Sequence, residues 1–200
     1  MHSLNDLDTS GKVLYLGVSD TPAWVVAKAN QYARDHGLRQ FTVYQGMWNA
    51  AMSDFERDIV LMCRDEGMGL CPYRVLNQGR FQTEARFTER EKKNDGRNFV
   101  PFSEHDKKVS RVLEDVANAE GAELLQVSQA YVLYKTPYVF PIVGTRKVGH
   151  LKGVIPALGI SLTTTEIEKI ESAYTFNPGF PHTFLSGTLF SSNPPKAPWL

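Results

Sequence analysis

Four short apolar runs are spaced along the chain, with segments between and after them in which apolar residues recur every three or four positions. The runs fall at 13–18, 41–45, 68–73 and 138–143 and are rich in strand-forming residues, so each predicts a buried strand. The periodic segments predict helices at 22–36, 54–67, 109–121, 124–134, 148–158 and 163–174. Continuous apolar strands that alternate with helices predict an α/β protein, in which helices cover a parallel sheet.

Residues at the helix ends refine this prediction. Thr21 is a typical N-cap, and Pro22 after it suits the first position of a helix. Asp54 is placed to cap the second helix. Pro156 falls inside the pattern of 148–158 and is expected to weaken that helix.

Two segments show neither pattern. Residues 77–105 are polar and without a period, and the charged run 84–93 within them is expected to lie in a solvated loop; loops of this length are usually functional or disordered. From Asn177 onward the chain carries five prolines and no period, which predicts a strap or a disordered end. We therefore expect one folded unit over 1–176 and a proline-rich tail over 177–200.

Composition narrows the class of protein. With 200 residues, 42% of them hydrophobic and 22% charged, the chain resembles one soluble globular domain. Its 22 Lys and Arg balance 22 Asp and Glu, so no net charge draws it to nucleic acid or to an anionic membrane. No apolar run reaches the roughly 20 residues of a membrane span, and the N-terminus lacks the pattern of a signal peptide, so a cytoplasmic protein is expected. Cys63 and Cys71 stand in no metal-ligand or disulfide spacing, so we expect buried thiols and no metal site.

Four motifs, in order and spacing, resemble the second half of the aldo-keto reductases. They are Gly-Lys-Val-Leu-Tyr-Leu-Gly-Val-Ser-Asp at 11–20, Val-Tyr-Gln at 43–45, Cys-Pro-Tyr-Arg-Val-Leu-Asn-Gln-Gly at 71–79, and Pro-Ile-Val-Gly-Thr-Arg at 141–146. The fungal aryl-alcohol dehydrogenase branch, with its norsolorinic acid reductase-like enzymes, is the most similar. The resemblance implies a partial (β/α)8 TIM barrel over 1–176, made of about the last four βα units with parallel strands. A complete barrel typically takes about 250 residues.

The resemblance also implies NADP as cofactor and assigns residues to its nicotinamide end. Ser19, Asp20 and Gln45 match the side chains that hold the nicotinamide carboxamide in this family. A carboxamide needs both a donor and an acceptor, and the amide of Gln45 offers both. Tyr73 matches the aromatic residue on which the nicotinamide ring stacks.

The phosphate groups of NADPH are assigned in the same way. Gly79 matches the loop beside the pyrophosphate, where a missing Cβ lets the backbone approach. Gly144, Thr145 and Arg146 follow the last predicted strand, and His150 follows on the first turn of a helix. A strand end, a glycine and a helix N-terminus suit an anion, and Arg146 adds the positive charge that the 2′-phosphate of NADPH requires.

No catalytic residue is assigned. In this family an Asp, a Tyr, a Lys and a His carry out catalysis, and they lie in βα units that precede the first motif. No position of this sequence matches them. Tyr44 and Tyr73 are the tyrosines expected near strand ends, and neither has a Lys and Asp pair by motif to lower its pKa.

Three hypotheses follow. The first is an NADP(H)-dependent oxidoreductase that reduces a small aldehyde or ketone, in fungal secondary or aromatic metabolism. The second is a catalytically silent fragment that binds nucleotide or a partner chain. The third is a half-barrel that becomes active by pairing with a chain that supplies the missing strands. In all three, an uncovered sheet would favour self-association or pairing.

Overall fold

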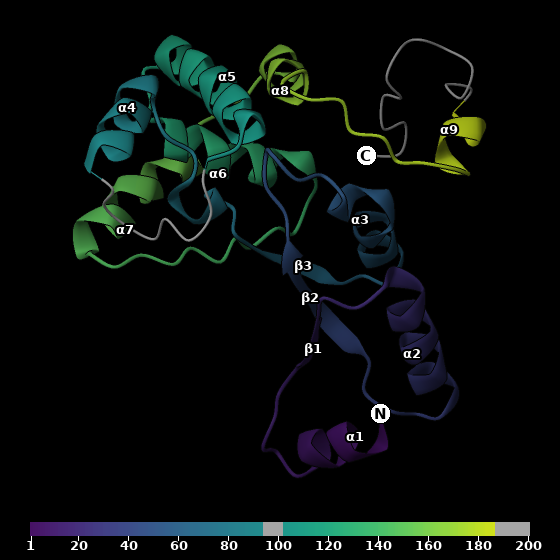
Figure 1. The fold of residues 1–200 in the computed structure, drawn as a ribbon. Helices are drawn as coiled ribbons and strands as arrows, with labels where there is room; N and C mark the ends of the chain where they lie inside the picture. The colour runs from purple at the N-terminus through teal and green to yellow at the C-terminus, as the bar shows by residue number, and fades with distance from the viewer. Residues whose placement is uncertain (94–101, 187–200) are drawn as a thin grey trace.

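Three of the four predicted strands form a parallel sheet in the computed structural model, which describes residues 1–93 and 102–186 (Figure 1). The strands are β1 (Leu16–Ser19), β2 (Phe41–Met47) and β3 (Gly69–Tyr73), and they lie in the order β1-β2-β3. Because neighbouring strands are parallel, their carboxyl ends meet at one edge of the sheet. The predicted α/β class with parallel strands is confirmed.

Helices connect the strands and continue after the sheet. α2 (Ala23–Asp35) and α3 (Phe55–Asp65) join successive strands, as their apolar periodicity predicts. The other helical elements are α1 (His2–Thr9), η1 (Asn77–Gly79), α4 (Glu84–Lys93), α5 (Glu104–Glu120), α6 (Leu124–Lys135), α7 (Val148–Val154), η2 (Ile155–Gly159), α8 (Thr164–Glu171) and α9 (His182–Leu185). The helix predicted at 148–158 is divided into α7 and the 3₁₀ turn η2, which has Pro156 near its start.

The expected side-chain caps at Thr21 and Asp54 are wrong. α2 begins after Pro22 without a side-chain cap, because the Thr21 hydroxyl donates instead to the carbonyl of Ser19 (2.9 Å). Asp54 is the N-cap residue of α3 but makes no capping hydrogen bond. Its carboxylate pairs with the guanidinium of Arg57 (2.7 Å). In both cases a nearby polar partner replaces the helix amide.

The two faces of the sheet have different surroundings. Val18, Tyr44 and Leu70 lie in one row across the strands and belong to the core that α2 and α3 cover. Figure 1 shows both helices on this side of the sheet. The next row, Ser19, Gln45 and Cys71, points to the opposite face, where the first two are exposed and the third is half-buried. This opposite face, called the open face below, has no helix over it among the described residues.

The predicted fourth strand at 138–143 is not a strand, although its chain runs beside β3. Val139 forms an isolated parallel bridge with Leu70, and the Ile142 amide donates to the carbonyl of Pro72 (2.8 Å). A regular parallel ladder would also need the amide of residue 72 to donate to the carbonyl of Phe140. Pro72 has no N–H, so the ladder is broken at that point.

The segment 77–105 is not one long loop, which corrects the prediction. The charged run 84–93 forms α4, and α5 begins at Glu104. Phe87 anchors α4 by packing edge to face on Phe102, with 5.0 Å between ring centroids. A single buried aromatic in a run of charged residues gives no period to detect, which is why the pattern predicted a loop. Residues 94–101 of this segment lie outside the described residues.

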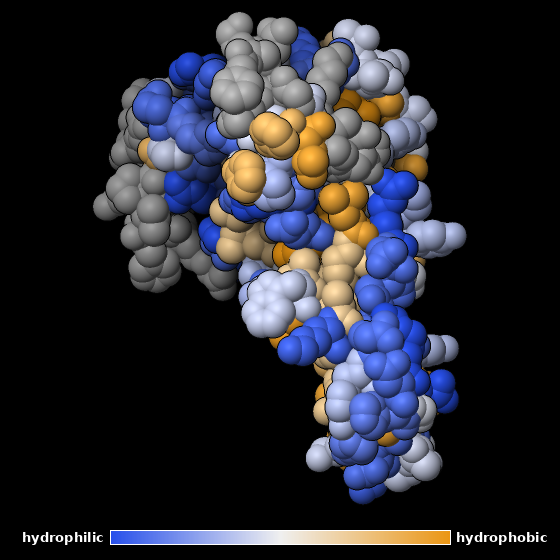
Figure 2. All heavy atoms as spheres, turned by 90° about the vertical axis from the view of Figure 1, so that its right-hand side faces the viewer, coloured by the Kyte–Doolittle hydropathy of each residue, from blue (hydrophilic) through white to orange (hydrophobic). Residues whose placement is uncertain are grey.

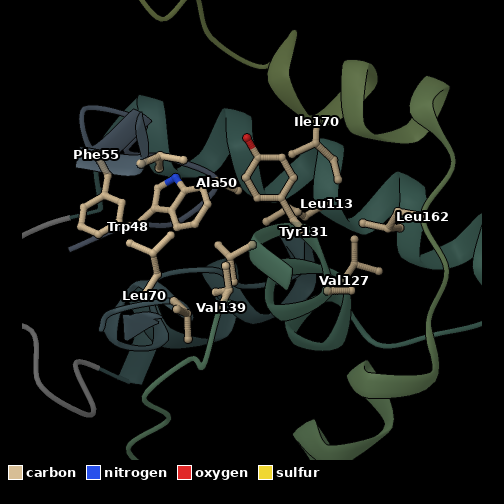
Figure 3. Packing of buried hydrophobic residues seen from close by; sticks show 14 of the residues in the cluster. Trp48, Ala50, Phe55, Leu70, Leu113, Val127, Tyr131, Val139, Leu162 and Ile170 are labelled. Atoms are coloured by element: carbon tan, nitrogen blue, oxygen red, sulfur yellow. The ribbon is translucent and has the colours of Figure 1, made fainter. Parts of the chain in front are cut away.

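A second part of the core fills the space where α3, α5, α6 and α8 meet. Trp48 and Tyr131 are fully buried there, and the Trp48 indole stacks on Phe55 with 5.4 Å between ring centroids (Figure 3). The indole N–H donates to the carboxylate of Glu56 (2.9 Å), which also pairs with Lys135 (2.9 Å). These contacts fix α3, and with it the sheet edge, to the C-terminal helices.

The start of the predicted tail lies against α3. Arg57 donates to the carbonyl of Pro178 (2.9 Å), and His182 in α9 lies 3.3 Å from the carboxylate of Asp58. Up to Ser186 the segment is therefore a strap; residues 187–200 lie outside the described part of the chain. Figure 2 shows this side of the molecule, with apolar residues at the height of α3 and α9 and polar residues over α1 and α2.

Candidate functional site

Four residues expected at the nicotinamide end of the cofactor come together at the carboxyl ends of the strands. The Tyr73 hydroxyl donates to Asp20 Oδ1 (3.0 Å), and the Ser19 hydroxyl donates to Asp20 Oδ2 (2.9 Å). Gln45 is the register partner of Ser19, and its carbonyl accepts a hydrogen bond from the Asp20 amide (3.1 Å). The cluster of Ser19, Asp20, Gln45 and Tyr73 is called the strand-end cluster below.

The backbone around this cluster is strained at two positions. Asp20 has φ +49° and directly follows β1, and Arg74 has φ +57° and directly follows β3. Residues other than glycine rarely adopt this left-handed conformation, at a cost of order 1–3 kcal/mol, and such residues gather at ligand sites. Both lie at the edge where ligands of parallel sheets bind, which marks this edge as the candidate site.

The two tyrosines near the strand ends keep their protons. Burial and the hydrogen bond to Asp20 raise the pKa of Tyr73, against a smaller opposing effect of the Arg74 charge. Burial also raises the pKa of Tyr44. The Tyr44 hydroxyl donates to the carbonyl of Thr21 (2.6 Å) and accepts from the Thr21 amide (3.0 Å), so it ties β2 to the chain after β1. Tyr44 is a core residue rather than a proton donor to a substrate.

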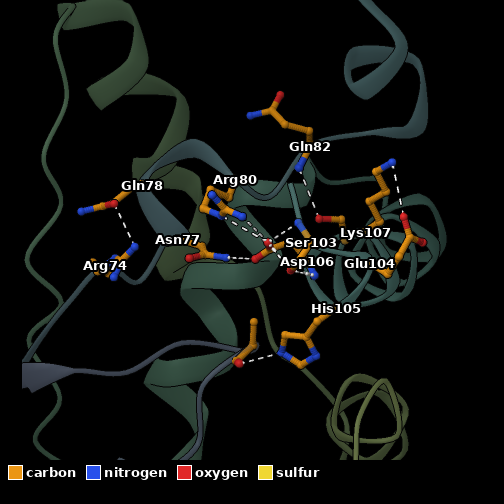
Figure 4. Close-up of polar contacts among 12 residues, drawn as sticks. Arg74, Asn77, Gln78, Arg80, Gln82, Ser103, Glu104, His105, Asp106 and Lys107 are labelled. Carbon is orange, nitrogen blue, oxygen red and sulfur yellow. Dashed lines mark hydrogen bonds and ion pairs between the residues drawn. The ribbon is translucent and has the colours of Figure 1, made fainter. Parts of the chain in front are cut away.

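The turn of residues 74–80, which follows β3 and contains η1, carries the next predicted residue, Gly79. Gly79 has φ +77°, and Asn77 and Gln78 before it are also left-handed, at +47° and +53°. Asp106 in α5 accepts hydrogen bonds from the side chains of Asn77 (2.8 Å) and Arg80 (2.6 Å) (Figure 4). Reasoning from the sequence did not single out Asp106, although Ser103 followed three residues later by an acidic residue is a capping-box pattern.

The residues expected at the 2′-phosphate form a separate group. Gly144, Thr145, Arg146 and His150 are all exposed and follow the segment that runs beside β3. Within residues 1–93 and 102–186, no hydrogen bond or ion pair joins them to the strand-end cluster, and Arg146 has no carboxylate partner. The structure therefore joins the nicotinamide-end residues through hydrogen bonds and does not join this group to them in that way.

Two grooves of about 600 Å³ each lie away from the strand-end cluster. One runs between α2 and α3 and includes Trp24 and Ile59. The other is apolar, lies at the amino ends of β2 and β3, and includes Tyr138 and Phe140. Neither is lined by a predicted cofactor residue. The carboxyl ends of the strands border the open face, so the described residues do not enclose this edge of the sheet. The hydrogen bonds of the strand-end cluster therefore indicate the candidate site better than the two grooves do.

The cysteines and possible ligand clusters add little to the site. Cys63 is buried and burial raises its pKa to about 12, whereas Cys71 on the open face is only half-buried, which corrects the expectation for that thiol. Both are free. The described residues hold no group of three or more His, Cys, Asp or Glu side chains that suits a metal ion. None of the helices in the described part is long and apolar enough to cross a membrane.

Comparison with curated proteins finds relatives over nearly the whole chain. The chain is 68% identical over 198 residues to norsolorinic acid reductase B of Aspergillus parasiticus, which covers 98% of this chain and 52% of that protein. It is 48% identical over 189 residues to aryl-alcohol dehydrogenase [NADP(+)] of Phanerodontia chrysosporium, with 91% and 49% covered. The chain thus spans about half the length of these relatives.

The fold agrees with that of a solved structure of an aldo-keto reductase. The thermostable aldo-keto reductase Tm1743, solved with the inhibitor epalrestat, matches with a TM-score of 0.67 at 23% identity, over 86% of this chain and 53% of that one. The model of the aldo/keto reductase family matches residues 1–175. This chain belongs to the aldo/keto reductase family.

Proposed function

We propose that this chain is the cofactor-binding half of an NADP(H)-dependent oxidoreductase that reduces aldehydes or ketones, similar to the aryl-alcohol dehydrogenases. The observation that carries the proposal is the strand-end cluster, in which Asp20 is hydrogen-bonded to Ser19 and Tyr73 at the carboxyl ends of parallel strands. Family membership supports an oxidoreductase, and the relative named aryl-alcohol dehydrogenase [NADP(+)] supports the choice of NADP.

The strand-end cluster suits the nicotinamide ring and its carboxamide. The Asp20 carboxylate accepts hydrogen bonds, and the exposed side-chain amide of Gln45 both donates and accepts, which matches the NH₂ and C=O of a carboxamide. Tyr73 is half-buried and its hydroxyl is held by Asp20, so its ring is fixed in place for stacking. Bound NADPH would supply the hydride, and these residues would orient the ring that carries it.

The phosphate groups of the cofactor are assigned to Gly79 and to the residues that follow 138–143, namely Gly144, Thr145, Arg146 and His150. Gly79 would let the backbone approach the pyrophosphate. Arg146 would pair with the 2′-phosphate, because its guanidinium has no carboxylate partner among the described residues and a charge-assisted bond to phosphate is strong. Gly144, Thr145 and His150 would lie beside the same phosphate.

In this proposal residues 1–176 form about the last four βα units of a (β/α)8 barrel, with 177–200 as a tail. The open face of the sheet would face the barrel interior and pack against the first four units. Those units would also bring the proton donor, since Tyr44 is held in the core. The exposed apolar side chains Tyr138, Phe140 and Ile142 along the open face favour pairing with such a half over the alternative of a catalytically silent fragment that binds nucleotide or another partner chain.

A fluorescence titration with NADPH and NADH tests the assignment. The wild-type chain should bind NADPH more tightly, and Arg146→Ala should cost about 1.5–3 kcal/mol of NADPH binding while leaving NADH almost unchanged. Arg39→Ala is the matched control, because it also removes one surface charge, at an arginine that pairs with Asp8. Equal loss for both nucleotides, or no binding of either by the wild type, would contradict the proposal.

A further inference from the structure

We infer that Asp106 is a positioning residue for nucleotide binding: its carboxylate holds the turn of residues 74–80 in the shape that admits the cofactor's pyrophosphate. This inference rests on the proposed function. It adds a residue that lies outside the strand-end cluster and that would act through the turn rather than by contact with the cofactor.

Asp106 is almost fully buried and both of its oxygens are used. Oδ1 accepts from the side-chain amide of Asn77 (2.8 Å). Oδ2 accepts from Arg80 at Nη2 (2.6 Å) and Nε (3.2 Å), and from the amide (3.0 Å) and hydroxyl of Ser103. Figure 4 shows the carboxylate at the centre of these contacts, between the turn and the first residues of α5. One side chain therefore joins two segments that are far apart in the sequence.

The two contacts to the turn are made by the first of three consecutive left-handed residues, Asn77, and by the residue that follows them, Arg80. Asn77 and Arg80 flank Gln78 and Gly79, and residues 77, 78 and 79 all have positive φ. Asn and Gly tolerate this conformation, but for Gln it costs free energy that other contacts must offset. Anchoring residues 77 and 80 to the same carboxylate fixes the course of the backbone between them.

Capping α5 does not by itself explain this arrangement. α8 has an equivalent capping box, in which Thr163 and Glu166 exchange the same hydrogen bonds. Glu166 makes those bonds with no arginine or asparagine from another segment. The bonds from Asn77 and Arg80 to Asp106 are thus additional to the cap, and they serve the turn.

Two variants of the 200-residue chain separate the role of Asp106 in capping α5 from its role in holding the turn. Asp106→Asn weakens both the cap and the anchor. Asn77→Gly removes one of the two contacts that anchor the turn and leaves the Arg80 contact and the capping box intact. It also keeps a residue that accepts φ near +47°. Glu166→Gln is the matched control, because it weakens the cap of α8 and touches no part of the turn.

The first readout is amide hydrogen exchange of Asn77, Gly79 and Arg80, whose N–H groups bond within the turn. Exchange at these amides should rise by about tenfold in Asp106→Asn and Asn77→Gly and stay unchanged in Glu166→Gln. Unchanged exchange in Asn77→Gly would overturn the inference even if the nucleotide does not bind. This readout needs no cofactor, so it is independent of the proposed function.

The second readout is the dissociation constant for NADPH and for NADH. Both nucleotides carry the pyrophosphate, so both variants should bind each of them on the order of tenfold more weakly, with the NADPH to NADH ratio unchanged. A purely structural role would lower the melting temperature without this loss, and faster exchange with unaltered binding would overturn the inference. Failure of the wild type to bind either nucleotide would instead refute the proposed function, and the exchange data would still decide whether Asp106 holds the turn.

Discussion

Asp106 carries its charge in surroundings that favour the ionised form. Burial alone would raise its pKa, but hydrogen bonds from Arg80, Ser103 and Asn77 outweigh burial and lower it from 3.8 to about 2. Because the folded state binds the proton less tightly than the unfolded state, this group stabilises the fold above pH 4, and the contribution is lost as the pH falls from about 4 to 2. The shift corresponds to about 2 kcal/mol.

This sign gives a prediction for acid unfolding. The free energy of unfolding, measured with urea at pH 5 and at pH 2, should fall between the two, and about 2 kcal/mol of that fall should be missing in Asp106→Asn. The reason is that an amide does not titrate in this range. If the variant loses as much stability on acidification as the wild type, the carboxylate does not have the lowered pKa.

Lys135 lies in a buried ion pair whose loss should be costly. Its ammonium group contacts the carboxylates of Glu56 (2.9 Å) and Glu171, and the Lys135 and Glu56 side chains are 9% and 4% exposed. Lys135→Met would leave Glu56 charged and buried without a cation, at a cost of about 3–5 kcal/mol in the free energy of unfolding. Lys169→Met is the control, because that lysine is half exposed, lies 3.7 Å from Asp115 and should cost less than about 1 kcal/mol. Equal losses by urea unfolding would show that burial of the pair contributes nothing.

At the scale of single residues, the sequence predicts the strand-end cluster but not Asp106. Ser19, Asp20, Gln45 and Tyr73 follow or end apolar strands, so a parallel sheet brings them to one edge without any knowledge of side-chain contacts. Asp106 lies 33 residues after Tyr73 in a segment that shows no strand or helix pattern at its start. Its partners depend on the left-handed course of the turn, and hydrophobic periodicity carries no information about such a course.

At the scale of elements, the pattern finds every strand that pairs regularly and fails where backbone chemistry intervenes. The apolar runs correctly identify the segments that lie side by side in the sheet, including 138–143. Regular strand pairing also needs a backbone N–H donor at every second residue, and Pro72 has no N–H. The prediction of a loop at 84–93 is wrong because a helix forms there without an apolar repeat. Its residues are good helix formers, and among residues 84–89 only Phe87 is buried, so the pattern shows no repeat. Both errors arise because one residue, Pro72 in the first case and Phe87 in the second, determines the local structure, and a single residue produces no periodic pattern.

Gly46 in β2 shows how closely the sheet packs on α3. A Cβ at this position would lie 2.6 Å from Phe55 Cε2 and 3.0 Å from Tyr44 Cε1, both in the buried core. Gly46→Ala should therefore lower the free energy of unfolding by about 1–3 kcal/mol. Gly17→Ala in β1 is the control, since its Cβ would meet nothing closer than 3.5 Å. Chemical denaturation of the two variants measures this difference in the free energy of unfolding. Equal values for Gly46→Ala and Gly17→Ala would mean that Phe55 moves aside without cost.

For the whole molecule, the open face of the sheet governs behaviour in solution. Phe140 and Ile142 beside β3 are 58% and 43% exposed, and β1 has an unpaired edge. Exposed apolar faces and free strand edges favour association. Sedimentation of the purified chain should therefore show self-association or precipitation, and an added N-terminal half-barrel of a related reductase should convert it to a soluble complex. A stable monomer at high concentration that ignores the added half would count against the proposed barrel.

The proposed barrel also gives a prediction for turnover. Delivery of a hydride to a carbonyl needs a proton donor at the developing alkoxide, and general acid catalysis is typically worth about 10²–10⁴-fold. Tyr44 is 1% exposed with its hydroxyl bound to Thr21, and the Tyr73 hydroxyl is bound to Asp20, so the 200-residue chain with NADPH should reduce an aromatic aldehyde such as veratraldehyde no faster than a buffer blank. Adding or fusing the first four βα units of a related reductase should restore turnover, because in the proposed barrel those units supply the general acid. NADPH-dependent turnover by the chain alone that is abolished by Tyr44→Phe would instead show that this tyrosine leaves the core and acts as the acid.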